Sequence, residues 1–474
     1  MTAKINRNKE FIINTIILFA GKFSTQFMSL LLLPLFTRYL LTEDYGAVDL
    51  LQTYISLFIP ILTLRIDSAL FRFLIDKRND EVEKCNIVSN AIVIMSVSII
   101  VTIIISIPII LFLNIRFIIY TIINLIILMI SNILLQLLRG LGKNKEYSLA
   151  SIITGAVTLI SNLVLIIGCH VGAESILISS SLGNILCIVY ITVSSKLFKY
   201  IKLDNVNKYT TKEILKYSLP MIPNYLSWWI VNISDRTIIS TFLGTAFNGI
   251  YTVSCKFSNI LNSVFSIFSM SWQETASLHI NDNDKDYFFS KVINEIFFLF
   301  SNIALIILAV LPVFYDILIG ANYLDSYNYI PILLYANSWN VLIGLIGGIY
   351  VAKKQSRAIA NTTMASAVIN ILINLMLVKF VGLYAASIST LLSYLIMGIY
   401  RYFDCKKYVN IKIDFKTFSI FSIVFVISSL LYYSNNIYLN LVNLLFVIIY
   451  SLIINKKYIF KAINFFKIKI IKRL

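Results

Sequence analysis

Long apolar runs dominate this sequence and constrain its fold more than any other feature. Runs of about 20 mostly apolar residues recur from one end to the other, and a helix of that length crosses the hydrocarbon core of a bilayer. Only 13% of the residues are charged and the mean hydropathy is +0.84, whereas soluble domains carry about 25% charged residues. We therefore predict an all-α, polytopic membrane protein.

Charged and turn-forming breaks divide the chain into about fourteen expected spans. They are 11–36, 46–74, 87–113, 117–138, 148–168, 174–195, 216–242, 247–271, 291–312, 328–350, 358–379, 382–400, 416–433 and 438–455. Fourteen spans need about 280 residues. In a chain of 474 residues, this leaves no room for a sizeable extramembrane domain.

Basic residues gather in alternate loops. With the N-terminus inside, the cytoplasmic segments hold 32 of the 40 Lys and Arg residues, and the outside loops hold about three. Because Lys and Arg concentrate on the cytoplasmic side of helical membrane proteins, both termini are expected in the cytoplasm. This placement explains the net charge of +17 without a nucleic-acid partner. The basic, apolar stretch 456–474 is expected to lie as a helix against membrane lipids.

A repeat lies within the apolar background. A shift of 210 residues superposes 143–191 on 353–401 without a gap, and it keeps the polar loop, the Gly turn and the following span in phase. The shift covers six spans, so both copies keep the same orientation, and parallel repeats of this kind place the substrate path between the halves. In addition, the pairs Tyr45-Gly46 and Asn248-Gly249 open corresponding spans.

The repeat divides the chain into three expected parts. We predict one lobe of six helices over 1–200 and a second lobe of six helices over 201–410. The last two helices and the basic tail occupy 411–474. The two lobes are expected to be related by an axis along the membrane normal.

Four basic residues fall deep within the first two expected helices of each lobe: Lys22, Arg65, Arg236 and Lys256. An ionised side chain near the bilayer centre costs a few kcal/mol or more, so it normally faces water or a partner. We expect the four to line a wet, electropositive cavity between the lobes, which would suit an anionic substrate. Ion pairs are the alternative, of Arg65 with Asp67 or another acid, and of Arg236, which lies beside Asp235, either locally or across helices.

Polar side chains accompany these cations at helical spacing. Gln26 follows Lys22, and Asn259 and Asn262 follow Lys256. We include Gln26 and Asn259 among the expected substrate-binding residues. The alternative is that such side chains hydrogen-bond neighbouring helices together.

No group of residues predicts catalysis, a metal site or a cofactor. His170 and His279 are expected on opposite faces of the membrane, and the five cysteines are scattered. The longest expected outside loop, 313–327, carries Asp316 and Asp325 but is too short for a catalytic domain. We therefore do not expect an enzyme.

The order of these features resembles a known family. The opening NTIILFAGKFSTQFMSLLLLPLFTRYLLTEDYGAVDL, the segment LTLRIDSALFRFL and the loop RGLGKNKEYS are similar to the Wzx-type polysaccharide flippases of the multidrug/oligosaccharidyl-lipid/polysaccharide exporter superfamily. Pro34, Arg38, Tyr45-Gly46 and Arg72 carry the most specific part of the resemblance. Arg65 departs from it, because a small residue is expected there.

The resemblance implies a function and a location. Such proteins move oligosaccharide repeat units linked to undecaprenyl pyrophosphate from the cytoplasmic to the outer leaflet of the bacterial cytoplasmic membrane, for O-antigen, capsule or similar polysaccharides. Expected partners are this lipid-linked oligosaccharide, membrane lipids, and the polysaccharide polymerase and glycosyltransferases of the pathway.

Two other functions stay open. The first is a cation-coupled small-molecule or multidrug exporter of the same superfamily, which would carry more deep carboxylates than deep cations. The second is a membrane polysaccharide polymerase or glycosyltransferase, which would need a larger external loop. If the protein couples transport to protons or sodium, Asp67 and Asp235 are the candidate residues.

Overall fold

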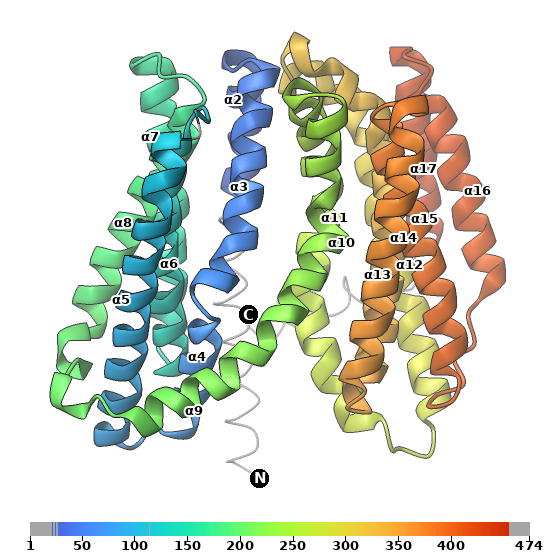
Figure 1. Cartoon of the computed structure of the whole chain (residues 1–474). Coiled ribbons are helices and arrows are strands. Elements are labelled where there is room, and N and C mark those ends of the chain that lie inside the picture. Colours follow the sequence, from blue (N-terminus) through green and yellow to red (C-terminus); the bar gives the residue numbers. More distant parts are fainter. Residues whose placement is uncertain (1–20, 22–23, 25–26, 113, 455–474) are drawn as a thin grey trace, which may run out of the picture. The chain divides into compact units, whose positions relative to one another are not determined.

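The computed structural model describes residues 21, 24, 27–112 and 114–454, and every regular element within them is a helix (Figure 1). This confirms the all-α prediction. Helices satisfy their backbone hydrogen bonds within one segment, which hydrocarbon surroundings demand. The stretch 456–474 and much of the first expected span lie outside the described residues.

The chain divides into two compact units, Met1–Gly249 and Ile250–Leu474. The helices of the first unit are α2 (Leu33–Tyr39), α3 (Thr42–Leu62), α4 (Ile66–Asp76), α5 (Glu81–Phe112), α6 (Ile118–Gly140), α7 (Asn144–Leu163), η1 (Val164–Gly168), α8 (Glu174–Ser195), η2 (Leu197–Tyr200), η3 (Leu203–Asn205), α9 (Lys208–Ser218), η4 (Leu219–Met221) and α10 (Ile222–Phe242). The start of α11 (Thr245–His279) belongs to this unit as well.

The second unit contains the rest of α11 and the helices that follow it. These are α12 (Lys285–Leu318), η5 (Ala321–Tyr329), α13 (Ile330–Ala352), α14 (Ser356–Val381), α15 (Tyr384–Cys405), α16 (Phe415–Tyr432) and α17 (Ile437–Ile454). The expected division of the chain near residues 200 and 410 stays a prediction.

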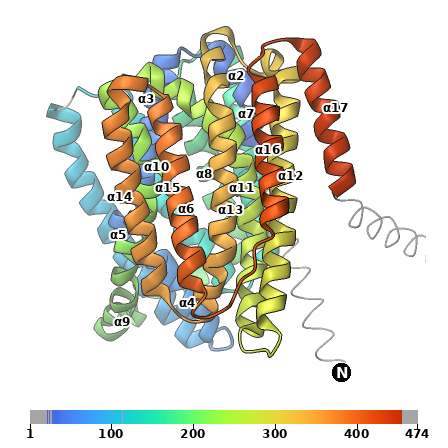
Figure 2. The same ribbon diagram turned by 90° about the vertical axis from the view of Figure 1, so that its right-hand side faces the viewer.

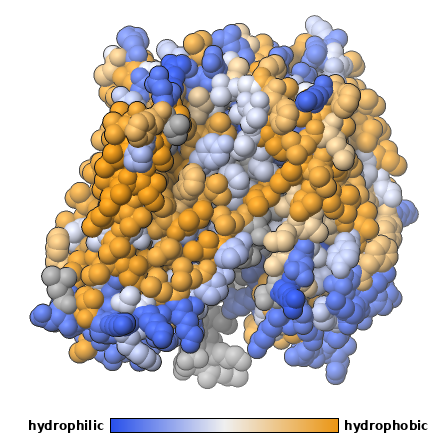
Figure 3. Space-filling model, in the orientation of Figure 1, coloured by the Kyte–Doolittle hydropathy of each residue, from blue (hydrophilic) through white to orange (hydrophobic). Residues whose placement is uncertain are grey.

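Ten helices of the described residues are long and apolar enough to cross a membrane, so this is a multi-pass membrane protein. On each unit, hydrophobic side chains cover the middle and hydrophilic side chains gather toward the ends (Figure 3). The expected spans 216–242, 247–271 and 382–400 coincide with α10, α11 and α15, which are not among the ten. The total of fourteen spans and the side on which the termini lie stay predictions.

The expected repeat coincides with matching helices in the two units. Both bounds of α15 lie 210 residues after those of α8. Furthermore, α8 packs against α6 and α7 in the first unit. In the second unit α15 packs against α13 and α14 (Figure 2). The shift found in the sequence therefore relates two helices of the same length, α8 and α15, whose neighbours correspond to each other.

Candidate functional site

The second expected span is broken, and Arg65 lies at the break. The sequence predicted a span over 46–74 without a break, and the structure divides this stretch into two separate helices, α3 and α4. Leu64 and Arg65 have φ angles of 50° and 54°, a left-handed conformation that crowds the Cβ of any residue except glycine. Such strain is frequently found at functional sites. Pro60, inside the last turn of α3, removes one backbone donor just before the break.

The Arg65 guanidinium has partners on three sides. Its Nη1 lies 3.2 Å from Oδ2 of Asp67, its Nη2 donates to Oγ of Ser68, and its Cζ lies 4.1 Å from the centre of the Tyr225 ring. The local ion pair with Asp67 that the sequence left open is therefore present. Even so, Nε of Arg65 and Oδ1 of Asp67 are buried without a hydrogen-bond partner among the described residues. Buried polar atoms without partners are costly, and a polar guest that accepted from Nε of Arg65 or donated to Oδ1 of Asp67 would remove that cost.

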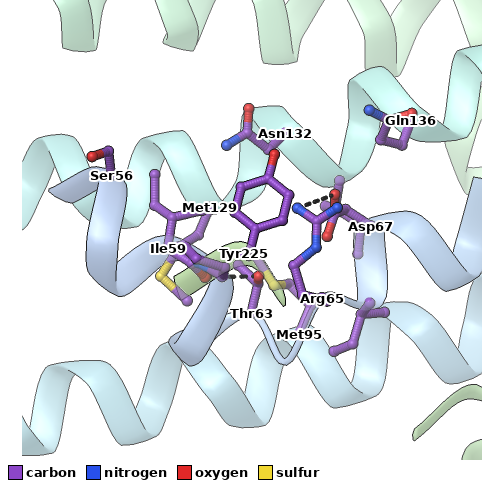
Figure 4. A pocket seen from close by; sticks show the side chains of 13 residues that line it. Ser56, Ile59, Thr63, Arg65, Asp67, Met95, Met129, Asn132, Gln136 and Tyr225 are labelled. Carbon is purple, nitrogen blue, oxygen red and sulfur yellow. Dashed lines mark hydrogen bonds and ion pairs between the residues drawn. The ribbon is translucent and has the colours of Figure 1, made fainter. Parts of the chain in front are cut away.

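A cavity of about 270 Å³ opens beside this ion pair (Figure 4). The guanidinium of Arg65 lies next to the Tyr225 ring, and Asn132 lies near the hydroxyl end of that ring. Asn132 and Gln136 of α6 add two amides to the lining, and Met129 adds an apolar wall. A guanidinium, two amides and a phenol can together hydrogen-bond phosphate oxygens or sugar hydroxyls.

Arg236 of α10 forms a second buried ion pair, with Asp49 of α3. Its Nε lies 3.0 Å from Oδ2 of Asp49, and the two side chains are 19% and 11% exposed. Nη1 of Arg236 donates to Oγ1 of Thr53 over 3.5 Å, and Asn248 donates to the Asp49 carboxylate over the same distance. The sequence had left open a local or a cross-helix ion pair for Arg236, and the structure shows the cross-helix one, with a carboxylate of α3.

Polar contacts continue along α3 from this ion pair to the cavity. Asp49, Thr53 and Ser56 are spaced by four and three residues, so they share one face of the helix. Trp229 of α10 donates from Nε1 to the Thr53 carbonyl and to Oγ of Ser56, both over 3.1 Å. Ser56 also lines the cavity. An ion pair and hydrogen bonds therefore join α3 and α10 between Asp49 and Ser56. Ionisable residues within membrane helices are rare, and they normally face a partner or a water-filled cavity.

The other expected site residues are not among those that line the Arg65 cavity. Lys22 and Gln26 lie outside the described residues. Lys256 and Asn259 lie on α11 in the second unit, where Lys256 is half-buried and Asn259 is exposed. Asn259 accepts a hydrogen bond of 3.3 Å from Asn262. That the four cations line one cavity stays a prediction.

The sequence places this chain in a family. Residues 11–272, more than half of the chain, match the family described as polysaccharide biosynthesis protein. The chain belongs to this family. The match includes α3, α4, α6 and α10, which line the Arg65 cavity and hold the Asp49–Arg236 pair, and it confirms the resemblance seen in the sequence. A search of curated proteins found no match.

The fold of this chain is similar to that of solved structures of a flippase and of transporters. The lipid II flippase MurJ in an inward closed conformation is 16% identical, with a TM-score of 0.68 over 94% of this chain and 100% of that chain. An inward-facing multidrug resistance MATE family transporter of the MOP superfamily is 13% identical, with a TM-score of 0.65 over 83% and 94%. A mutant of the Vibrio cholerae MATE transporter VcmN is 10% identical, with a TM-score of 0.57 over 86% and 98%.

Sequence reasoning missed a buried arginine of this polysaccharide biosynthesis protein. Arg401, near the end of α15, is only 2% exposed, and its burial was not expected from the sequence. It donates to Oγ1 of Thr362 and Thr363 over 2.8 and 3.0 Å and to the Ile359 carbonyl over 3.3 Å. The one signal was the run of polar residues at 361–363 on the facing helix α14.

Proposed function

We propose that this protein is a flippase that moves an oligosaccharide linked to undecaprenyl pyrophosphate from the cytoplasmic to the outer leaflet of a bacterial cytoplasmic membrane. The family supports a role in polysaccharide biosynthesis, for which O-antigen and capsule are the expected products. The fold, which is also that of a lipid II flippase, supports transport across a membrane. A polysaccharide polymerase and glycosyltransferases are the proposed partners of the pathway.

The observation that carries the proposal is the surroundings of Arg65. The guanidinium of Arg65, between α3 and α4, lines a cavity with polar side chains. Its Nε is buried and has no hydrogen-bond partner among the described residues. Guanidinium groups bind phosphate oxygens with two parallel hydrogen bonds. A pyrophosphate can therefore replace Asp67 as the partner of Arg65, which would release the carboxylate as the anion arrives.

The physical task explains why such a group is needed. Burying an unpaired charge in hydrocarbon costs far more than thermal energy, and a hydrated, cationic cavity lowers that cost. We propose that the same transport path, between lobes 1–200 and 201–410, is also lined by Lys22, Arg236, Lys256, Gln26 and Asn259. The two lobes belong to a bundle of fourteen spans and rock against each other during transport. The polyprenyl chain stays in lipid. Because the potential is negative inside, outward movement of each negative charge gains about 2.3 kcal/mol per 100 mV.

Flipping measured in proteoliposomes tests the role of Arg65. Arg65→Gln is expected to lower the rate of translocation of the lipid-linked oligosaccharide at least tenfold, and Arg65→Lys is expected to keep an intermediate rate. Arg72→Gln is the matched control, since Arg72 pairs with Asp76 at 3.1 Å and both are about half exposed. Equal rates for Arg65→Gln and the control would refute the proposed role.

A second candidate function is a cation-coupled exporter of small molecules, which the fold shared with MATE transporters favours. Asp67 and Asp235 would then bind the coupling ion. Depletion of the protein separates the two functions. The flippase proposal expects a lipid-linked oligosaccharide to accumulate in the cytoplasmic leaflet, whereas an exporter expects loss of drug efflux with no change in that lipid. A polymerase or glycosyltransferase would instead leave unpolymerised glycan in the outer leaflet.

A further inference from the structure

A second polar cavity lies at one end of the Ile250–Leu474 unit. It has a volume of about 420 Å³ and is formed by the end of α12, by η5 and by the turn between α16 and α17. Its residues are remote in sequence from Arg65 and from every other residue of the proposed transport path. The charge distribution of the sequence predicts that this end faces the outside.

The cavity is rich in hydrogen-bond acceptors. Asp316 and Asp325 both line it, none of its lining residues is basic, and no ion pair joins either carboxylate to a described basic residue. Asn440 lines it as well, is only 4% exposed, and its Oδ1 has no hydrogen-bond partner among the described residues. A buried amide oxygen normally accepts a hydrogen bond from a donor. A ligand that donates hydrogen bonds would therefore complement this oxygen and the two carboxylates.

The frame of the cavity is fixed by tyrosines of η5 and α16. The rings of Tyr327 and Tyr432 stack with their centres 3.8 Å apart. Each hydroxyl donates to the backbone carbonyl of the other residue, over 2.8 Å from Tyr327 and 2.9 Å from Tyr432. Tyr433 also donates to the Asn328 carbonyl over 2.7 Å. Two segments more than a hundred residues apart are thereby held together, so the cavity is formed before a guest arrives, which lowers the entropic cost of binding.

We propose that this cavity binds a protonated amino sugar. A positive charge complements Asp316 and Asp325, and sugar hydroxyls and the ammonium supply the donors that Asn440 and the carboxylates lack. Tyr315 and Tyr327 also line the cavity. The volume falls within the range of small-molecule sites, roughly 300 to 1,000 Å³.

A metal ion is the alternative guest, and the side chains favour it less. A dedicated calcium site uses six to eight oxygen ligands, commonly from several carboxylates. No group of three or more His, Cys, Asp or Glu that could hold a metal occurs in the part of the chain that the structure describes. Two carboxylates with tyrosine rings between helices fit an organic cation better.

Binding to the full-length protein in lipid nanodiscs tests the proposal. Glucosamine and N-acetylglucosamine are a matched pair of probes, because they differ in the ammonium group and share the ring hydroxyls. We expect calorimetry to detect binding of glucosamine at neutral pH and at least tenfold weaker binding of N-acetylglucosamine. Equal binding of the two sugars, or binding of neither, would overturn the proposal.

Variants locate the site. Asp316→Asn together with Asp325→Asn is expected to weaken glucosamine binding at least tenfold, and Asn440→Leu at least threefold. Asp284→Asn removes one carboxylate just before α12, at the opposite end of that helix, and is expected to change binding less than twofold. The Tm of each variant, measured by thermal unfolding, shows whether the variant is folded. Asp316 and Asp325 are exposed, so we expect replacement of either by the isosteric amide to leave the fold intact. Unchanged binding in the double variant, or calcium displacing glucosamine at equal concentration, would contradict the amino-sugar site.

Discussion

Gly46 of α3 and Gly249 of α11 lie with their backbones in contact. A Cβ built on Gly46 would lie 2.6 Å from the backbone nitrogen of Gly249 and would also collide with the Thr245 carbonyl oxygen. Asn248 donates from its side chain to the Gly46 carbonyl over 2.8 Å. The two glycines open spans that correspond in the sequence repeat, so corresponding helix starts pack directly on each other. Small residues allow this close approach in membrane helices.

Gly46→Val is therefore expected to destabilise the protein. The added side chain has no space, and overpacking of this kind costs about 1–3 kcal/mol. Thermal unfolding of the detergent-solubilised protein measures the loss as a lower Tm. Gly168→Ala is the control, because nothing lies within 4 Å of a Cβ at that position, and its Tm is expected to stay close to that of the parent protein.

Asp49→Leu is expected to cost more than the loss of one contact. It leaves the Arg236 guanidinium buried without this carboxylate, and breaking a buried ion pair from one side costs about 3–5 kcal/mol. Asp49→Leu combined with Arg236→Met should recover most of that loss, since both charges are then gone. Asp76→Ala breaks the exposed pair with Arg72 and should cost less than about 1 kcal/mol. A double variant as unstable as Asp49→Leu would show that the pair itself is not the cause.

Arg401→Met is expected to change stability little. The Thr362 and Thr363 hydroxyls that accept from Arg401 also donate to carbonyls of their own helix, so they keep a partner, and no described carboxylate forms an ion pair with the guanidinium. Replacement of a buried charge by an apolar side chain of similar volume is often neutral. Arg401→Ala leaves a void and should cost about 2 kcal/mol or more. Thermal unfolding of both variants distinguishes packing from charge.

The first turn of α16 is expected to lose stability in acid. Asp414 caps this helix, accepting from the Thr417 amide over 3.2 Å and from the Thr417 hydroxyl over 2.6 Å. These two hydrogen bonds lower the pKa of Asp414 below its ordinary value of 3.8. Because the folded state binds the proton more weakly than the unfolded state, the cap contributes fully above the ordinary pKa, and its contribution falls as the pH drops through the lower, folded value.

Hydrogen exchange of the α16 amides between pH 6 and pH 3 measures this effect, after correction for the intrinsic pH dependence of exchange. Protection of the first turn should fall toward the acid end in the parent protein. Asp414→Asn keeps a capping side chain that does not titrate, so its corrected protection should be independent of pH. Asp414→Ala should weaken the turn by about 1 kcal/mol at neutral pH. A parent protein whose corrected protection is flat over this range would contradict the role of the carboxylate.

The sequence predicted the positions of most helices well, but it did not predict the break between α3 and α4. Hydrophobic runs located most helices, because they depend on local composition. The expected span 382–400 differs from α15 (Tyr384–Cys405) by a few residues at each end, while the repeat shift of 210 residues relates the bounds of α8 and α15. The break at Leu64 and Arg65 was missed, since neither residue is a glycine and the apolar pattern continues across it. A single proline, at position 60, was the only local sign.

The sequence named the partner in one of the two ion pairs and left the partner of the other open. Asp67 pairs with Arg65 because two residues in a tight bend can face each other. The partner of Arg236 is Asp49, far away in the chain, and only the packing of α10 on α3 brings the two together. The burial of Arg401 was not predicted for the same reason, since it depends on the packing of α15 against α14.

The bend at Leu64 and Arg65 has a mechanical consequence. An unbroken helix is a stiff rod, so a pull at one end moves the whole of it. Here only short turn hydrogen bonds, from Leu64 to Ile61 and from Ile66 to Thr63, span the joint. A ligand that binds the Arg65 side chain therefore binds at the joint itself, where the ladder of helix hydrogen bonds between α3 and α4 is interrupted.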